Sequence, residues 1–365
     1  MIKKILKKIT YKVGLWIPNR VKMDGFAAKK ILEDYSQKPK GTCYKKNNVE
    51  IKYGLQVIIP VYNAEKWIRE CLNSVFQQNP KYTTLVTIVN DGSTDETAAI
   101  LKEATSRQSW GGGKMTVEVI TQENRGYSGA RNAALQTLKG EYILFLDSDD
   151  FLPENAINQM LDAAHKWNAD ILQGSWYTFD EKEKKLYIVP TEGVLNEKKD
   201  ALSGFPWGKL YKYTILENFR FPAGFWFEDT PISFILFAMP YRFAAIKEIV
   251  YGYRLNPNGI TALAVHEKKS LDTYWITEEC LEEFTDFNLK YDQRAYEYIL
   301  RQSVMNWRRL NKHPQEIQKA VFVETGELIK KYFPSFQTNE TQMKEIEKML
   351  REKRFTSFKM IIRGM

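Results

Sequence analysis

The stretch at residues 142–150, YILFLDSDD, constrains the fold more than any other part of the chain. Five apolar or aromatic residues in a row predict a short strand buried on both faces, and the run ends at Asp147, Asp149 and Asp150. Such a strand brings carboxylates to the carboxyl edge of a sheet, where open α/β sheets bind ligands. Clustered carboxylates stay ionised together when a cation lies among them, and hard oxygen ligands suit Mg²⁺ or Mn²⁺. The alternative is a solvated turn, because Asp and Ser are common turn residues.

Strands and helices are predicted to alternate on both sides of this stretch. Further strands are predicted at residues 55–59, 85–89, 116–120 and 171–172. Helical spacing of apolar residues separates them. One such stripe consists of Trp67, Ile68, Cys71, Leu72, Val75 and Phe76. The alternation predicts an α/β protein with a doubly wound, mostly parallel sheet.

Each predicted strand delivers a polar loop to the same edge of that sheet. PVYNAE follows the first strand at residues 60–65, and NDGS follows the second at residues 90–93. Within the second loop, Asp91 is placed to accept a hydrogen bond from a ribose hydroxyl or a base N–H, as acids do in dinucleotide folds. Neither a Walker lysine nor G-x-G-x-x-G follows the first strand. Phosphates would therefore have to be held by a metal ion and by basic groups from elsewhere.

Four segments carry a resemblance to a known family. In this order and spacing, VIIPVYNAEKWIRECLNSVFQQ, IVNDGSTDET, NRGYSGARNAAL and YILFLDSDD resemble the nucleotide-sugar-binding half of family 2 glycosyltransferases with the GT-A fold. Any one segment is weak evidence, but four in register are specific. The resemblance is strong over roughly residues 55–155 and continues more loosely to about residue 262.

The resemblance implies a UDP-sugar site and a metal site. The residues that it implies for the nucleotide sugar are Pro60, Tyr62, Glu65, Asp91, Arg131, Asp147, Lys209, Arg254 and Thr261. Asp147 and Asp149 match the two ends of the family's DxD motif, and Asp149 is expected to touch Mg²⁺ or Mn²⁺ most directly. His266 is a further candidate ligand of the metal. Its alternative role is that of a solvated or packing histidine.

The acceptor side is predicted beyond residue 170. Aromatic residues at 225–227 precede the acidic pair Glu228-Asp229. Aromatic faces stack on sugar rings, and a carboxylate can take the proton from an attacking hydroxyl. In the related enzymes the second acid of such a pair is the general base, which here is Asp229. The competing interpretation is structural, because Thr230 and Pro231 also read as the start of a helix.

Positive charge gathers at both ends of the chain, whose net charge is +8. Residues 1–12 contain five lysines and no acid, with apolar residues at helical spacing, and residues 348–363 contain six basic residues and one acid. This pattern favours contact with an anionic membrane surface, and the alternative is that both segments dock on the protein itself. Nucleic acid is not expected as a partner, because zinc-finger spacing and RNA-binding aromatic signatures are both absent. No apolar run approaches the roughly 18 residues that cross a bilayer.

We therefore expect three regions: a basic N-terminal extension and linker at residues 1–53, a GT-A catalytic domain at 54–262, and a C-terminal helical subdomain at 263–365. The resemblance implies a metal-dependent, inverting hexosyl- or N-acetylhexosaminyltransferase. It would move a sugar from a UDP-sugar to a hydroxyl of an envelope or lipid-linked glycan. Its expected place is the cytoplasm, peripheral on the inner face of the cell membrane. The alternatives are a sugar nucleotidyltransferase and an inactive glycan-binding scaffold.

Overall fold

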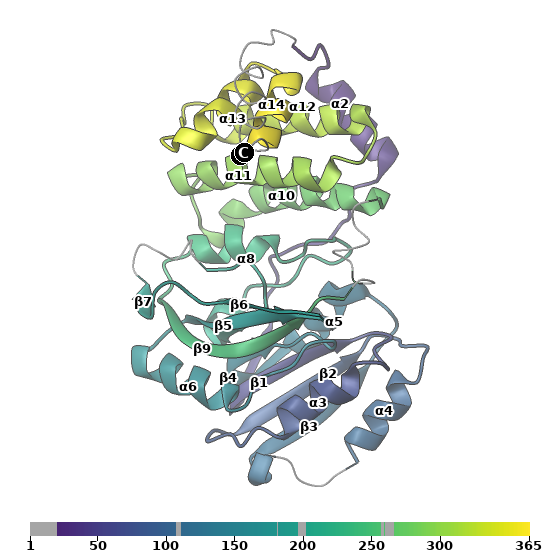
Figure 1. Ribbon diagram of the computed structural model, residues 1–365, viewed down its shortest axis with the longest axis vertical. Coiled ribbons are helices and arrows are strands. Elements are labelled where there is room, and N and C mark those ends of the chain that lie inside the picture. The colour runs from purple at the N-terminus through teal and green to yellow at the C-terminus, as the bar shows by residue number, and fades with distance from the viewer. Residues whose placement is uncertain (1–19, 107–110, 181, 196–201, 257–258, 260–265) are drawn as a thin grey trace. The chain divides into compact units, whose positions relative to one another are not determined.

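The chain folds into two compact units (Figure 1). The computed structural model describes residues 20–106, 111–180, 182–195, 202–256, 259 and 266–365. One unit spans residues 40–257, and we call it the sheet unit. The other joins residues 1–39 to residues 258–365, and we call its described part the helical unit.

The sheet unit is built on one mixed sheet, which in the described residues has the strand order β3-β2-β1-β4-β8-β5-β9-β7, with β6 paired to β5. The four strands β3, β2, β1 and β4 are parallel, which confirms the predicted doubly wound arrangement. Beyond them β8 runs antiparallel between β4 and β5, while β5 and β9 pair in parallel. The bounds are β1 (Asn48–Val61), β2 (Thr84–Asn90), β3 (Met115–Thr121), β4 (Thr137–Phe145), β5 (Ile171–Phe179), β6 (Lys184–Tyr187), β7 (Gly193–Leu195), β8 (Lys209–Lys212) and β9 (Phe243–Arg254).

The helices of the sheet unit pack against the strands, and the order of the strands indicates which strand ends can bind a ligand. They are α3 (Ile68–Phe76), α4 (Thr97–Ala104), α5 (Gly126–Leu135), α6 (Ala156–Trp167), α7 (Tyr213–Leu216) and α8 (Thr230–Phe234), with short 3-10 turns at Gly111–Gly113 and Leu236–Ala238. Apolar residues of α3, α4 and α6 share one core with β1, β2 and β4. The chain moves outward from β1 to β3 and then returns past β1 to β4. The point where the direction reverses, between β1 and β4, is where doubly wound sheets form a ligand crevice.

The helical unit confirms the predicted C-terminal helical subdomain. Its helices are α2 (Gly25–Tyr35), α10 (Asp272–Glu282), α11 (Gln293–Leu310), α12 (Gln315–Tyr332), α13 (Thr341–Arg351) and α14 (Phe355–Gly364), with 3-10 turns at Lys268–Leu271 and Phe284–Phe287. Helix α2 packs on α12, and its N-terminal turn is capped by Asp24, whose carboxylate accepts from the Ala27 N–H at 2.8 Å. The sequence predicted an N-terminal extension and linker that reach residue 53, with no helix at residues 25–35. The structure instead has α2 there, followed by the first residues of β1. Only Ala28 and Leu32 of α2 are buried, which is too weak a period to read from the sequence.

The prediction of membrane contact fares differently at the two basic ends of the chain. Residues 1–19 lie outside the described part of the chain, so membrane contact there stays a prediction. At the other end, α14 buries Phe355, Phe358, Ile361 and Ile362 within the helical unit. The apolar face that was expected to meet a membrane is therefore used for packing, and docking on the protein is the correct interpretation for that segment. In the part of the chain that the structure describes, no helix has the length and apolar character needed to span a bilayer.

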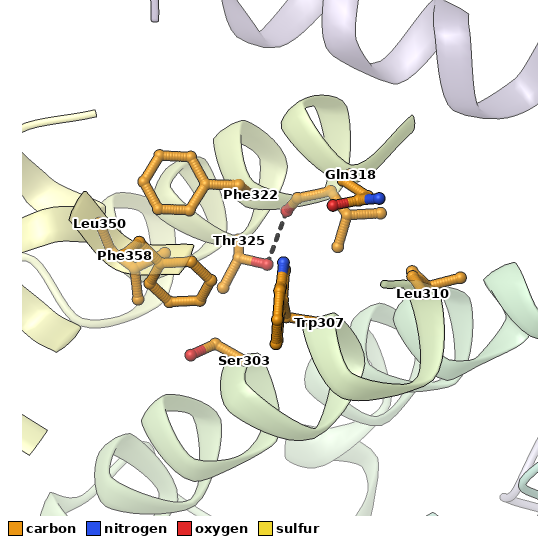
Figure 2. Close-up of a pocket in the computed structure, with 9 residues that line it drawn as sticks. Ser303, Trp307, Leu310, Gln318, Phe322, Thr325, Leu350 and Phe358 are labelled. Atoms are coloured by element: carbon orange, nitrogen blue, oxygen red, sulfur yellow. Dashed lines mark hydrogen bonds between the residues drawn. The ribbon is translucent and has the colours of Figure 1, made fainter. Parts of the chain in front are cut away.

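A small cavity lies between α11, α12 and α14 (Figure 2). The centre of a water-sized sphere can occupy a volume of only about 10 Å³ inside this cavity. That is room for about one water molecule. Rings of Trp307, Phe322 and Phe358 surround it. It is a packing gap and not a site for a small-molecule ligand.

Charged residues join α2, α10 and α12 in the helical unit. Lys29 of α2 lies 2.6 Å from Glu278 of α10. Burial raises the pKa of the nearby Glu324 on α12 to about 7, Glu278 and Glu327 add to the rise, and Lys29 and Tyr274 oppose it. The folded-state pKa thus lies above the ordinary value of 4.5. Stability from this group is complete below about pH 4.5 and is lost as the pH rises through about 7.

Replacing Glu324 with glutamine should remove the loss of stability that accompanies ionisation of Glu324 at high pH. We expect Glu324→Gln to melt at a higher temperature than the wild type at pH 8, with the difference shrinking towards zero as the pH falls to 5. Circular dichroism melting curves at four pH values would measure it. Glu327→Gln is the matched control, because Lys353 and Lys330 lower the pKa of Glu327 despite its burial. That variant should gain nothing at pH 8. Equal shifts for both variants at all pH values would contradict the prediction.

Candidate active site

The loops after β1 and β2 lock together at the carboxyl edge of the sheet. The Asp91 N–H donates to the Val61 carbonyl at 2.8 Å, continuing the ladder between the strands. Oδ1 of Asp91 accepts from the Gln122 side chain at 2.6 Å and from the Arg125 N–H at 2.9 Å. Asp91 is therefore held in place by the loop after β3, and it is only 2% exposed.

The first loop carries three more of the residues that were expected to bind the nucleotide sugar. They differ in how far their side chains are exposed. Pro60 is buried at the end of β1, whereas Tyr62 is 45% exposed and presents its ring to solvent. Glu65 is exposed, and its carboxylate accepts from the Glu96 N–H at 3.0 Å just before α4. Of these side chains, the ring of Tyr62 is the one best placed to stack on a ligand.

The acid loop, residues 147–150, follows β4 and is clamped onto β9. Asp150 is 1% exposed and both of its carboxylate oxygens are engaged. One accepts from the Tyr251 hydroxyl at 2.7 Å and the other from the Arg254 N–H at 2.7 Å. The same Tyr251 hydroxyl accepts from the Asp147 N–H at 3.2 Å. Asp150 is thus a structural carboxylate, which leaves Asp147 and Asp149 as the acids that can meet a ligand.

Asp149 lies in a strongly negative setting. Burial, followed by the neighbouring charge of Asp147, raises the pKa of its carboxyl, and a hydrogen bond from Asn256 at 3.1 Å opposes the rise. A divalent cation at these two acids would relieve their repulsion, so the pair fits a hard metal ion. Among the described residues, no three His, Cys, Asp or Glu side chains gather closely enough to hold one. Phosphate and water oxygens would have to complete the coordination.

Arg254, one of the residues implied for the nucleotide sugar, ends β9 beside the acid loop. Its Nε donates to the Asp149 carbonyl at 2.9 Å, and its Nη2 lies 2.5 Å from Glu70. The guanidinium also lies over the rings of Trp67 and Phe179, with its carbon 4.1 and 4.5 Å from the ring centres. These contacts fix Arg254 next to Asp149 and account for its low exposure.

Arg131 of α5 joins the acid loop to the predicted catalytic pair. It is 2% exposed, its Nη2 lies 2.8 Å from Asp147 and its Nη1 lies 2.6 Å from Glu228. Burial alone would lower the pKa of the guanidinium, but Asp147 and Glu228 outweigh burial and raise it. The ring of Phe221 covers the guanidinium at 5.2 Å. One buried cation therefore sets the spacing between the two acidic loops.

The loop that carries Asp229 is backbone-strained and leads directly into α8. Phe227 has φ +59°, an uncommon angle for a residue with a large side chain. Its carbonyl accepts from the Thr230 N–H at 3.0 Å, which closes a tight turn around Glu228 and Asp229. The Asp229 side chain makes no capping hydrogen bond to α8. The helix-start interpretation thus accounts for the position of Asp229 in the chain, but its carboxylate does not act as the cap of α8.

The other three predicted site residues have different outcomes. Lys209 on β8 is completely buried, and its Nζ donates to the Ser203 hydroxyl and to the Phe205 carbonyl, both at 2.7 Å. An amine enclosed in this way supports the loop around it and has no direct path to a bound nucleotide. Thr261 lies outside the described residues. His266 is exposed in the helical unit, so its role as a metal ligand stays a prediction.

Tyr251 is a site residue that the sequence did not single out. Its hydroxyl joins Asp147 to Asp150, and its ring stacks on Trp207 at 4.5 Å. The one signal in the sequence was its place in the run YGYR, whose last residue, Arg254, ends β9. The intervening Gly252 permits the fit, because a Cβ there would lie 2.7 Å from the ring of Phe151. Only the pairing of β9 with the acid loop, about a hundred residues away, reveals this role.

Comparison with known proteins identifies relatives of the sheet unit. The family model described as Glycosyl transferase family 2 matches residues 56–244. The chain is 30% identical over 224 residues to the glycosyltransferase GlyA of Streptococcus pneumoniae, a match covering 57% of this chain and 31% of GlyA. Over 117 residues it is 33% identical to the poly(ribitol-phosphate) beta-N-acetylglucosaminyltransferase TarS of Staphylococcus aureus, which covers 32% of this chain and 20% of TarS. The matches thus span less than a third of either relative.

A solved structure shares the fold over a longer stretch. The crystal structure of S. aureus TarS 1-349 in complex with UDP-GlcNAc superimposes with a TM-score of 0.65 at 22% sequence identity. The alignment covers 84% of this chain and 90% of that chain. At this level of identity the likeness establishes the fold alone.

Removing the Tyr251 hydroxyl tests how the acid loop is held. Tyr251→Phe keeps the ring on Trp207 but leaves Asp150 buried with one donor fewer, so we expect the free energy of unfolding to fall by about 1–3 kcal/mol. Urea titration would measure it. Tyr142→Phe is the matched control, because that buried hydroxyl donates to the neutral Ala169 carbonyl at 2.9 Å. A loss no larger than in the control would show that the hydroxyl does not offset the buried charge.

Proposed function

Because the chain belongs to glycosyl transferase family 2, we propose that it transfers a sugar from a UDP-sugar to a hydroxyl of an envelope glycan, with inversion at the anomeric carbon. The donor would be a UDP-hexose or UDP-N-acetylhexosamine. The UDP-GlcNAc complex of TarS, a protein with the same fold, supports this donor class. The polymer in the name of the TarS relative and the basic residues at 1–12 support an acceptor at the cell envelope.

The observation that carries the proposal is the ion-pair link made by Arg131. Asp147 belongs to the acid loop that follows β4, and Glu228 adjoins the candidate base Asp229; Arg131 pairs with both Asp147 and Glu228. Transfer with inversion needs the base and the leaving group on opposite sides of one sugar carbon, at a defined separation. A buried guanidinium that holds both loops supplies such a fixed separation.

The donor would lie across the ends of β1, β2 and β4. The ring of Tyr62 would stack on the base, and Asp91 would accept from the nucleoside. Mg²⁺ or Mn²⁺, held by Asp149 with Asp147, would neutralise charge on the departing diphosphate. Arg254, fixed beside Asp149, would add positive charge near the same leaving group. These assignments keep the donor on the acid-loop side of Arg131.

The acceptor would lie on the Asp229 side of Arg131. The Asp229 carboxylate would take the proton from the acceptor hydroxyl as its oxygen bonds to the anomeric carbon. The bond from that carbon to the UDP oxygen breaks in the same step, and its electron pair leaves with UDP. The strained turn at Phe227 would hold the carboxylate in position for this step.

Exchange of the candidate base gives a direct test. Asp229→Asn keeps the shape but cannot take a proton, so transfer should fall by about 100-fold or more while UDP affinity persists. The assay would be UDP release from a panel of UDP-sugars with wall teichoic acid or capsular polysaccharide as acceptor. Asp162→Asn, an exposed aspartate on α6, is the matched control and should retain activity. Loss of UDP affinity in Asp229→Asn would assign the residue to the donor site.

The metal assignment is tested at two neighbouring acids. Asp149→Asn should weaken UDP binding in the presence of Mn²⁺ and make no difference in EDTA, because a neutral amide is a poor ligand for a hard cation. Asp150→Asn should lower stability without this metal dependence, since the Asp150 oxygens are already occupied. Calorimetric titration with UDP would separate the two. Equal UDP affinity of the wild type in Mn²⁺ and in EDTA would overturn the metal assignment.

A further inference from the structure

A column of stacked aromatic rings leads from the acid loop to the surface of the sheet unit. The ring of Tyr251, whose hydroxyl holds Asp150, stacks on Trp207 at 4.5 Å and 12°. Trp207 in turn stacks on Phe205 at 4.7 Å and 6°. Trp207 is 4% exposed and Phe205 is 43% exposed, so Phe205 is the outer member of the column. Its ring is supported from within and open to solvent.

The backbone under Phe205 is anchored by an unusual polar arrangement. The completely buried Lys209 donates to the Phe205 carbonyl and to the Ser203 hydroxyl, both at 2.7 Å. Gln173 of β5 completes the network, because its side-chain oxygen accepts from the Ser203 N–H at 2.9 Å and from its hydroxyl at 3.1 Å. Burying a lysine is costly unless its donors are satisfied. An apolar residue would fill the same space at lower cost, so the lysine serves to fix the loop.

The anchored loop also lies against the helix that follows the candidate base. A Cβ added to Gly204 would be 3.2 Å from the Ser233 hydroxyl of α8. Helix α8 begins immediately after Asp229. The charge of Asp229 also acts on Lys209, where it opposes the effect of burial, which lowers the pKa of the amine well below its usual range. Phe205 is therefore linked through its own loop to Asp229 and through its ring column to the acid loop.

We propose that the ring of Phe205 is a stacking platform for a pyranose ring of the acceptor, and that Lys209 is the positioning residue that holds this platform beside Asp229. The proposal rests on the function proposed above, and it names a specific contact for the acceptor. One face of a pyranose carries C–H groups, which are attracted to the negative face of an aromatic ring.

The occupant follows from the surroundings of the ring. A donor sugar would be placed by its diphosphate at the ends of β1 and β4, whereas Phe205 adjoins the loop of the base, which must contact the acceptor. A protein partner would need an extended apolar area, but the flanking Pro206 is buried and Gly204 has no side chain. A single supported ring matches a single sugar.

Saturation-transfer NMR tests the platform in the full chain with saturating UDP. The probes are methyl β-N-acetylglucosaminide and methyl β-glucoside, with irradiation of aromatic protons. We expect the wild type to transfer saturation to the ring C–H protons of at least one probe. Phe205→Tyr should keep this transfer, while Phe205→Ala and Phe205→Leu should weaken probe binding roughly three- to tenfold. Phe26→Ala, at a phenylalanine of α2 that is 83% exposed, is the matched control and should change nothing.

Lys209 is tested by separating probe binding from UDP binding. Lys209→Met keeps the apolar stem and removes the donors, so we expect probe binding to weaken as in Phe205→Ala while UDP affinity stays within about twofold. If this variant does not fold, Ser203→Ala replaces it, because it removes the hydroxyl that accepts from Lys209 and donates to Gln173. Weakened UDP and probe binding together would reduce Lys209 to a general structural role and overturn its part of the proposal.

The remaining outcomes distinguish the two proposals. The platform is overturned if the wild type binds UDP but transfers saturation to neither probe. It is also overturned if Phe205→Ala transfers saturation as strongly as the wild type. Either result leaves the proposed function standing. Full retention of binding in Phe205→Leu overturns stacking as the mode of contact. A wild type that binds no UDP overturns the proposed function itself.

Discussion

The buried guanidinium of Arg131 is the interaction on which the rest of the site depends. Its two carboxylate partners come from loops far apart in the sequence, Asp147 after β4 and Glu228 before α8. A buried cation is tolerated only when its charge is matched, and removal of one partner of such a pair typically costs about 3–5 kcal/mol. Each acidic loop is therefore held in place by the need to satisfy the same charge. The loops cannot drift apart independently.

A second set of contacts also fixes the acid loop. It uses Asp150, which points inward, and leaves Asp149 for a ligand. Asp150 turns inward to Tyr251 and to the backbone of Arg254, so one acid of the cluster is used up as a clamp. Burial, and then the neighbouring charge of Asp147, raises the pKa of Asp149, so its ionised form is unfavourable unless a cation lies beside it. Similarly, Phe227 adopts a backbone angle that costs roughly 1–3 kcal/mol. The fold thus places its unfavourable features at the edge where a ligand would arrive.

The sequence predicted the parts of the site that lie close together along the chain. The parallel strands, their polar loops and the acids at 147–150 follow from local patterns of burial and turn residues, and the structure has them where expected. Lys209 shows the limit of this reasoning, because a basic residue near a motif reads as a ligand contact until its complete burial is known. Tyr251 shows the complementary failure. Its role depends on a bridge between Phe151 and Gly252, and no local pattern encodes pairing across such a distance.

The same geometry separates the roles of the two acids that the sequence grouped as catalytic. Glu228 forms a 2.6 Å ion pair with Arg131. Accepting a proton there would remove one of the two negative charges that the buried guanidinium needs, and the loss would spread to Asp147 through the shared cation. The two ion pairs that link the loops through Arg131 are made by Asp147 and Glu228, and the Asp229 side chain does not cap α8. In the proposed mechanism, proton uptake at Asp229 leaves both of these ion pairs in place. In the proposed mechanism, Glu228 is therefore assigned to placing the base, and Asp229 to acting as the base.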